Sequence, residues 1–138
     1  MSATMMRIAS RLPSAMSDGP QRRILFVMNR WGSSAGGIQT VNHELACAVK
    51  RVEPSIDCVA VVTTASHQEI EDARLHDVTL VAGDSPDDWT SALLSDGLAI
   101  IHPSDVVAVV GHSHFSGLQA LSLRKRFFER ALAIHFVP

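Results

Sequence analysis

Short apolar runs alternate along this chain with longer stretches in which apolar residues recur at helical spacing. The first run, RILFVM from Arg23 to Met28, predicts a strand buried on both faces. An amphipathic helix is expected from Ile38 to Arg51, with polar residues such as Asn42 and Lys50 opposite its apolar side. Four further apolar or β-branched runs predict strands at residues 57–63, 78–82, 106–110 and 131–137.

Helix-start signals lie between these strands. Ser66 with Glu69 predicts a capping box, in which each side chain satisfies a free backbone amide. Ser85 precedes a proline and two aspartates, which suit the first turn of a helix. Ser116 with Gln119 predicts another capping box. Because strand, cap and helix recur, we expect a Rossmann-like α/β fold, an open parallel sheet with helices on both faces.

Composition and charge limit the class of protein. Apolar residues make up 46% of the chain and charged ones 19%, mixed too evenly for a transmembrane segment. The net charge of −2 and the scattered basic residues argue against nucleic-acid binding. Residues 1–21 are expected to be a disordered leader, with a transit peptide as the alternative, and residues 22–138 to be one domain.

The cysteines and histidines do not predict a metal site. Cys47 and Cys58 are too far apart for a CxxC motif, and we find no histidine or cysteine beside them at metal-ligand spacing. Buried reduced thiols are expected, which suits a cytoplasmic protein. His112 and His114 have no carboxylate or thiolate next to them, so we expect hydrogen-bonding loop histidines. His135, within the last strand, is expected to be a core histidine.

Ligands of an open parallel sheet bind at the carboxyl ends of the strands, where the strand order reverses. In the usual order that crevice lies between the first and fourth strands, and residues 29–37 and 111–116 would form its loops. Gly36 and Gly37 precede a helix, whose free amides attract anions. Their pattern is neither GxGxxG nor a P-loop. A tight turn therefore explains the pair as well as an anion site does.

The run GHSHF, between a strand and a helix, has the setting of a hydrolase nucleophile elbow at Ser113. Phe115 is bulky where that elbow needs a small residue. The acid and histidine that should follow are represented only by Glu129 and His135. A serine hydrolase therefore remains an alternative with poor support from the motif.

Taken in order, three segments resemble a known family. RILFVMNRWGSSAGGIQTVNHELACAV looks like the first strand, glycine loop and first helix of family 4-like glycosyltransferases of the GT-B fold, where GGIxTxxxELAxAL is common. VVAVVGHSHFSGLQAL resembles the fourth strand and HxH loop of that family, and ALAIHFVP resembles the next strand. The resemblance covers residues 23–138.

The resemblance implies roles for particular residues. Gly36 and Gly37 would lie against the diphosphate of a nucleotide-sugar donor. The acceptor or transferred sugar would lie in a cleft lined by one loop, at His112, Ser113 and His114. The catalytic cleft histidine of the family aligns with His135 or with Pro138, depending on register.

The resemblance also implies a function. The chain would be the N-terminal, acceptor-side domain of a retaining glycosyltransferase, without the C-terminal donor-binding domain and without a cofactor besides the sugar nucleotide. We expect it to be inactive alone, because it lacks that domain. A non-catalytic Rossmann-like module or relic is the alternative from another class.

Overall fold

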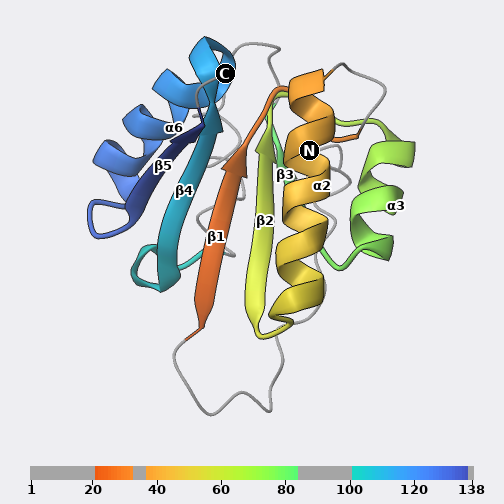
Figure 1. The fold of residues 1–138 in the computed structure, drawn as a ribbon, viewed down its shortest axis with the longest axis horizontal. Helices are drawn as coiled ribbons and strands as arrows, with labels where there is room; N and C mark the ends of the chain where they lie inside the picture. Colours follow the sequence, from red (N-terminus) through yellow and green to blue (C-terminus); the bar gives the residue numbers. More distant parts are fainter. Residues whose placement is uncertain (1–20, 33–36, 84–100, 137–138) are drawn as a thin grey trace.

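The computed structural model describes residues 21–32, 37–83 and 101–136, which form one open sheet of five parallel strands (Figure 1). The strands lie in the order β3-β2-β1-β4-β5, and each pairs in parallel with its neighbours. The order reverses beside β1, so the expected switch point between the first and fourth strands is confirmed. The strands are β1 (Arg22–Val27), β2 (Ile56–Val62), β3 (Thr79–Ala82), β4 (Val106–His112) and β5 (Leu132–Phe136).

Helices cover both faces of the sheet, as the sequence predicted. The helices are α2 (Gly37–Val52), α3 (His67–Leu75) and α6 (Ser113–Phe127), and a short 3-10 turn, η3 (Pro103–Asp105), leads into β4. Buried side chains of α2 and α3 pack in one cluster and those of α6 in another, on opposite faces of the strands. Figure 1 shows α2 lying along β2 with α3 beside it. None of the helices in the described segments has the length and apolar character needed to cross a membrane.

Strand β1 contributes to both cores. Leu25 packs with Leu123 of α6, whereas the next residue, Phe26, packs with Ala46 and Cys47 of α2. Successive side chains of a strand point to opposite faces, and here both faces are covered. The continuous apolar run that predicted this strand is therefore explained by burial on both sides.

The capping box at the start of α3 is confirmed. The side-chain oxygen of Ser66 accepts a hydrogen bond from the backbone amide of Glu69 at 3.2 Å, and the Glu69 carboxylate accepts one from the Ser66 amide at 2.8 Å. The second predicted capping box is wrong. Helix α6 begins at Ser113, directly after β4, so Ser116 lies inside the helix and cannot cap it. The helix predicted after Ser85 and most of the leader fall outside the described residues.

The polar side predicted for α2 is also partly wrong. Asn42 and Lys50 are buried, whereas Val41, placed on the apolar side, is 52% exposed. Lys50 can be buried because its ammonium group donates hydrogen bonds to the carbonyl oxygens of Pro54 at 2.8 Å and Ile56 at 3.1 Å. These partners lie in the turn after the helix and at the first residue of β2, so the local periodicity of the helix did not reveal them.

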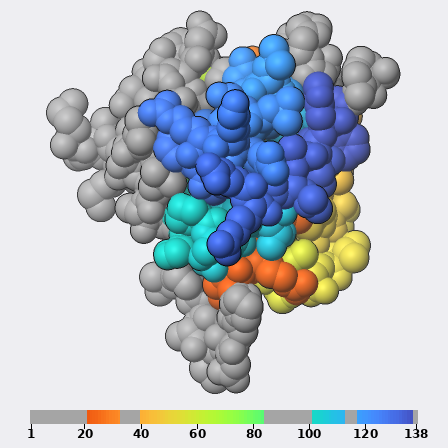
Figure 2. Space-filling view, turned by 90° about the vertical axis from the view of Figure 1, so that its left-hand side faces the viewer, coloured from red at the N-terminus to blue at the C-terminus, as the bar shows by residue number. Residues whose placement is uncertain are grey.

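Helix α6 and strand β5 form much of the surface on one side of the molecule (Figure 2). Leu118 of α6 is 66% exposed and Leu132 of β5 is 70% exposed. Strand β5 lies at the edge of the sheet, with β4 as its single partner among the described strands. Residues of β5 are therefore less covered than those of the inner strands.

Candidate functional site

The switch point brings two helix starts to the same edge of the sheet. Helix α2 begins at Gly37, after the loop that follows β1, and α6 begins at Ser113, directly after β4. Strands β1 and β4 are neighbours in the sheet. The first amides of a helix lack backbone partners and carry a partial positive charge. Gly37 thus lies where the sequence predicted an anion site. The other glycine of the pair, Gly36, is outside the described residues.

His112 ends β4 at this edge. It is only 5% exposed, and its imidazole stacks on the ring of Phe136 with centroids 4.9 Å apart and planes 14° from parallel. Phe136 is its register partner on β5. The His112 ring is therefore held by packing against the neighbouring strand. Ser113 and His114 open α6, but the described structure gives the placement of their backbones only.

His135 lies on β5 opposite Gly111 of β4. The expectation that it is a core histidine is wrong, because it is exposed on an edge strand. Its ring lies against Gly117 of α6, where an added Cβ atom would be 2.2 Å from Nε2. Glycine at this helix position therefore gives the imidazole its space. Pro138, the other residue proposed for the cleft histidine, is outside the described segments.

Two features of its surroundings affect the electrostatics of His112. Burial lowers the pKa of His112, and the nearby His135 lowers it further. His112 is consequently neutral near pH 7, so one ring nitrogen can accept a hydrogen bond. The structure brings these two predicted site residues to one edge of the sheet.

The lowered pKa of His112 predicts a pH-dependent stability. Between the lowered folded value and an unfolded value of about 6.5, the unfolded chain binds more protons, so the free energy of unfolding falls as the pH falls through that window. The contribution is fully present above the unfolded pKa. His112→Phe should make this decrease smaller, whereas exposed His67→Asn should leave it unchanged. Urea unfolding from about pH 7.5 to 5.5 in chelator tests this, and equal slopes for His112→Phe and the parent would refute it.

A hollow lies between the loop after β1, α2 and the start of α3, and no sequence pattern predicted it. Its volume is about 410 Å³, and it is lined by Arg30, Trp31, Gly32, His43, Ser66, Gln68, Glu69 and Asp72. The guanidinium of Arg30 donates to both carboxylate oxygens of Glu69, at 3.2 and 2.6 Å. This paired bond joins the β1 loop to α3.

Asp72 is the central acceptor beside this hollow. Its Oδ2 accepts a hydrogen bond from the indole nitrogen of Trp31 at 2.8 Å and lies 2.9 Å from Nε2 of His43. Burial alone would raise the pKa of Asp72, but the hydrogen bonds from His43 and Trp31 lower it below its usual value. Asp72 is therefore an ionised carboxylate that joins the β1 loop, α2 and α3.

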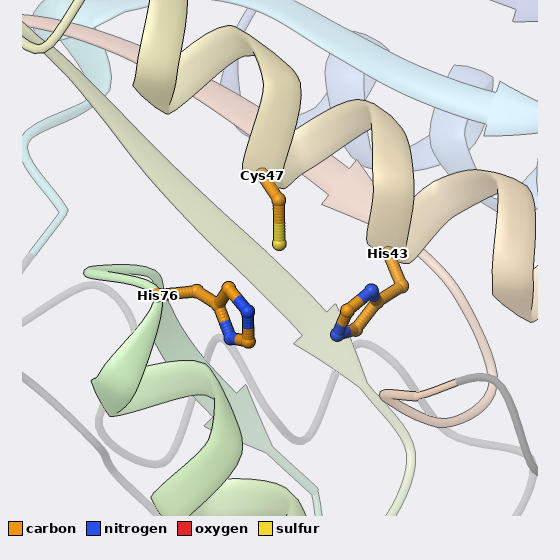
Figure 3. A group of neighbouring side chains, drawn as sticks. All are labelled: His43, Cys47 and His76. Carbon is orange, nitrogen blue, oxygen red and sulfur yellow. The ribbon is translucent and has the colours of Figure 1, made fainter.

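Both cysteines are buried free thiols, as expected. Burial raises the pKa of Cys47 to about 11 and that of Cys58 to about 12, so neither is a nucleophile at neutral pH. The interpretation that Cys47 has no histidine at metal-ligand spacing is wrong. His43 precedes Cys47 by four residues on α2 and therefore shares its face, and His76 reaches the same place from the end of α3 (Figure 3).

The geometry does not support the serine hydrolase. Ser113 is the first residue of α6, and Glu129 follows the end of that helix. A helix of 15 residues is about 22 Å long, so the proposed acid lies at the other end of the element. A catalytic acid must instead orient the histidine beside the nucleophile.

Comparison with known proteins gives one family. A family model described as "Family 4 Glycosyltransferase in conflict systems" matches residues 25–138. The match therefore spans every described helix and all five strands of the sheet, apart from the first residues of β1. No curated protein and no solved structure gives a significant match.

Proposed function

This chain belongs to the family 4 glycosyltransferases in conflict systems, as its motifs predicted, and on that premise we propose that it forms the acceptor-side half of a sugar-transfer site. It would be the N-terminal domain of a retaining enzyme that takes a sugar from a nucleotide diphosphate and passes it to an acceptor. A C-terminal GT-B domain would hold most of the donor. The family match across residues 25–138 is the observation that carries this proposal.

The arrangement at the switch point supports assigning the donor diphosphate to this edge. Helix α2 begins at Gly37 and α6 begins at Ser113. The free amides of both helix starts therefore follow the neighbouring strands β1 and β4. Amides and helix dipoles stabilise the charge that develops on a leaving diphosphate. The glycine lets a phosphate approach the backbone because it has no Cβ atom.

The histidines at this edge of the sheet are our candidates for contact with the acceptor or the transferred sugar. His112 is only 5% exposed, so we assign its neutral ring to the wall of the sugar cleft, where Phe136 keeps it in place. His135 lies on the adjacent strand, with its ring over Gly117, and it is our candidate for the catalytic cleft histidine. His114 and Ser113, at the start of α6, complete the proposed cleft.

The energies available at this half of the site indicate that it binds a nucleotide sugar only weakly by itself. A charge at a helix terminus gains about 0.3–1 kcal/mol, or about 2 kcal/mol when partly buried. Micromolar binding needs about 8 kcal/mol. Two helix starts therefore fall well short, and we expect no glycosyl transfer by the chain alone.

Amide chemical shifts of the ¹⁵N-labelled chain, titrated with UDP-glucose and with GDP-mannose, test the proposal. We expect weak, millimolar-range binding in which the signals of Gly37, His112 and Ser113 move. The amides of His67 and Gln68 are the control, because α3 also follows a strand but lies away from the switch point. The half-site would be contradicted if the amide signals of α3 moved as much as those at the switch point, or if the signals at the switch point did not move. Micromolar binding with glycosyl transfer by the chain alone would contradict it as well.

A further inference from the structure

Three potential metal ligands meet between α2 and the end of α3. One ligand atom from each of His43, Cys47 and His76 lies within 4.8 Å of the others. Figure 3 shows the three side chains pointing into one space, two from α2 and one from the residue that ends α3. Cys47 is 4% exposed, whereas the His76 side chain is 40% exposed, so the cluster is buried on the thiol side and open to solvent at His76.

Asp72 orients both imidazoles of this cluster. Nδ1 of His76 lies 2.9 Å from the backbone carbonyl oxygen of Asp72, and a carbonyl can only accept, so Nδ1 carries the proton. Nε2 of His76 is then the nitrogen with a free electron pair. Metal-binding histidines commonly donate their other N–H to a carbonyl or carboxylate in this way.

The same reasoning applies to His43. Its Nε2 lies 2.9 Å from Oδ2 of Asp72, the same carboxylate oxygen that accepts a hydrogen bond from the Trp31 indole, so Nε2 is the donor in this contact. Nδ1 of His43 then holds the electron pair. It is buried, makes no hydrogen bond to the described residues, and lies 3.4 Å from the Glu44 carboxylate. A buried nitrogen without a hydrogen bond is a group that a bound cation would satisfy.

We propose that His43, Cys47 and His76 bind one Zn²⁺ ion, with Asp72 as the positioning residue for both histidines. One thiolate and two imidazoles are ligands typical of zinc, whereas Mg²⁺ and Ca²⁺ prefer oxygen. The Cys47 thiol gives its proton to solvent as the Zn–S bond forms, and no electron transfer is involved. A water molecule takes the fourth position on the open side.

The cluster is slightly wider than a zinc site with metal bound. Ligand atoms around tetrahedral zinc are about 3.3–3.6 Å apart, given bonds of about 2.0–2.3 Å. Ligand atoms up to 4.8 Å apart therefore need to approach by about 1.2–1.5 Å, which side-chain rotations supply. The hollow of about 410 Å³ is lined by His43 and Asp72, so it borders the cluster on the side of His43.

The bound ion would fasten α2 to α3. The indole of Trp31 donates to the Asp72 carboxylate, so the loop after β1 would be held by the same site. The ligands lie on α2 and after α3, apart from the crevice between β1 and β4. The proposed zinc ligands and Asp72 are not among the residues proposed for the nucleotide-sugar site, so variants of the ligands test zinc binding without removing a residue of that site.

Cobalt titration of the full chain, made without a histidine tag and stripped with chelator, tests the thiolate ligand. We expect a thiolate-to-cobalt charge-transfer absorption that saturates near about one equivalent and disappears when Zn²⁺ is added. Cys47→Ala should abolish the absorption. Cys58→Ala is the matched control, since Cys58 is equally buried but outside the cluster, and it should keep the absorption. No absorption in the parent chain, or its persistence in Cys47→Ala, overturns the site.

Zinc affinities, measured by competition with a chromophoric chelator, test the histidines and Asp72. Asp72→Asn should weaken binding by about 10–100-fold, the usual cost of losing an outer-shell partner. His76→Asn should weaken it more, and exposed His67→Asn on α3 should not change it. Circular dichroism checks folding; if Cys47→Ala unfolds, His76→Asn decides the outcome. Parent-like affinity in His76→Asn overturns the ligand set. Asp72→Asn keeps the backbone carbonyl that contacts His76, so parent-like affinity in this variant overturns the positioning of His43 by the Asp72 side chain.

Discussion

Replacing Trp31 with alanine is expected to lower the free energy of unfolding by about 3–5 kcal/mol. Trp31 is fully buried and is the largest of the fully buried side chains in the described structure. It packs in the core under α2 and α3, with its ring 4.6 Å from that of His43. Alanine would leave a cavity in that core and remove the hydrogen bond to Asp72. Since domains are stable by only about 5–15 kcal/mol, the loss would be a large part of the total.

Trp31→Phe separates packing from hydrogen bonding. Phenylalanine fills most of the indole volume but leaves the Asp72 carboxylate without this donor, so we expect a loss of about 1–2 kcal/mol. Urea unfolding followed by circular dichroism in chelator-containing buffer measures both variants without a contribution from metal. If Trp31→Ala and Trp31→Phe lower the free energy of unfolding by the same amount, packing of the indole ring does not contribute to stability as described.

The inner strands of the sheet were predictable because they are short and are covered on both faces. The run around Leu25 and Phe26 is apolar without interruption, and such a strand needs a helix layer on each side. Parallel neighbours also require long crossovers, which the intervening helices supply. The order that places β1 beside β4 then follows the usual doubly wound topology, and with it the position of the crevice.

Side-chain environments were less predictable, because they depend on partners distant in sequence. A Ser-x-x-Gln pattern at Ser116 fits a capping box, but it also occurs within helices, and β4 continues directly into α6. His135 looked like a core residue because its neighbours are apolar. It is exposed because β5 has one strand beside it in the described sheet.

Two of the three residues of the histidine and cysteine cluster could have been predicted from the sequence. The spacing of four residues between His43 and Cys47 places both on one face of a helix, and that signal could have been noticed. His76 is 33 residues after His43 and belongs to another element. Its place in the cluster depends on how α3 packs beside α2, which no local pattern encodes.

Lys50→Met is expected to lower the free energy of unfolding by about 1–3 kcal/mol, because methionine keeps the length of the buried stem but donates no hydrogen bond. The Lys50 ammonium group is bonded to the carbonyl oxygens of Pro54 and Ile56, and it lies 3.6 Å from the carboxylate of Asp77. Asp77 has a backbone φ of 62° in the turn after α3, so Lys50 links two turns that enter the sheet.

Exposed Lys125→Met on α6 is the control for Lys50→Met, and it removes the same formal charge with an expected change within about 0.5 kcal/mol. Urea unfolding at pH 7 compares both variants with the parent chain. A difference below about 0.5 kcal/mol between the two variants would show that water replaces the ammonium group at both carbonyls without cost. A larger loss in Lys50→Met means instead that the turn after α2 depends on a side chain from the last part of that helix. In that case the fold requires a buried lysine on the side of the helix that was predicted to be polar. The carbonyl oxygens of Pro54 and Ile56 then need the Lys50 ammonium group as their donor, because water does not replace it when the helix packs against β2.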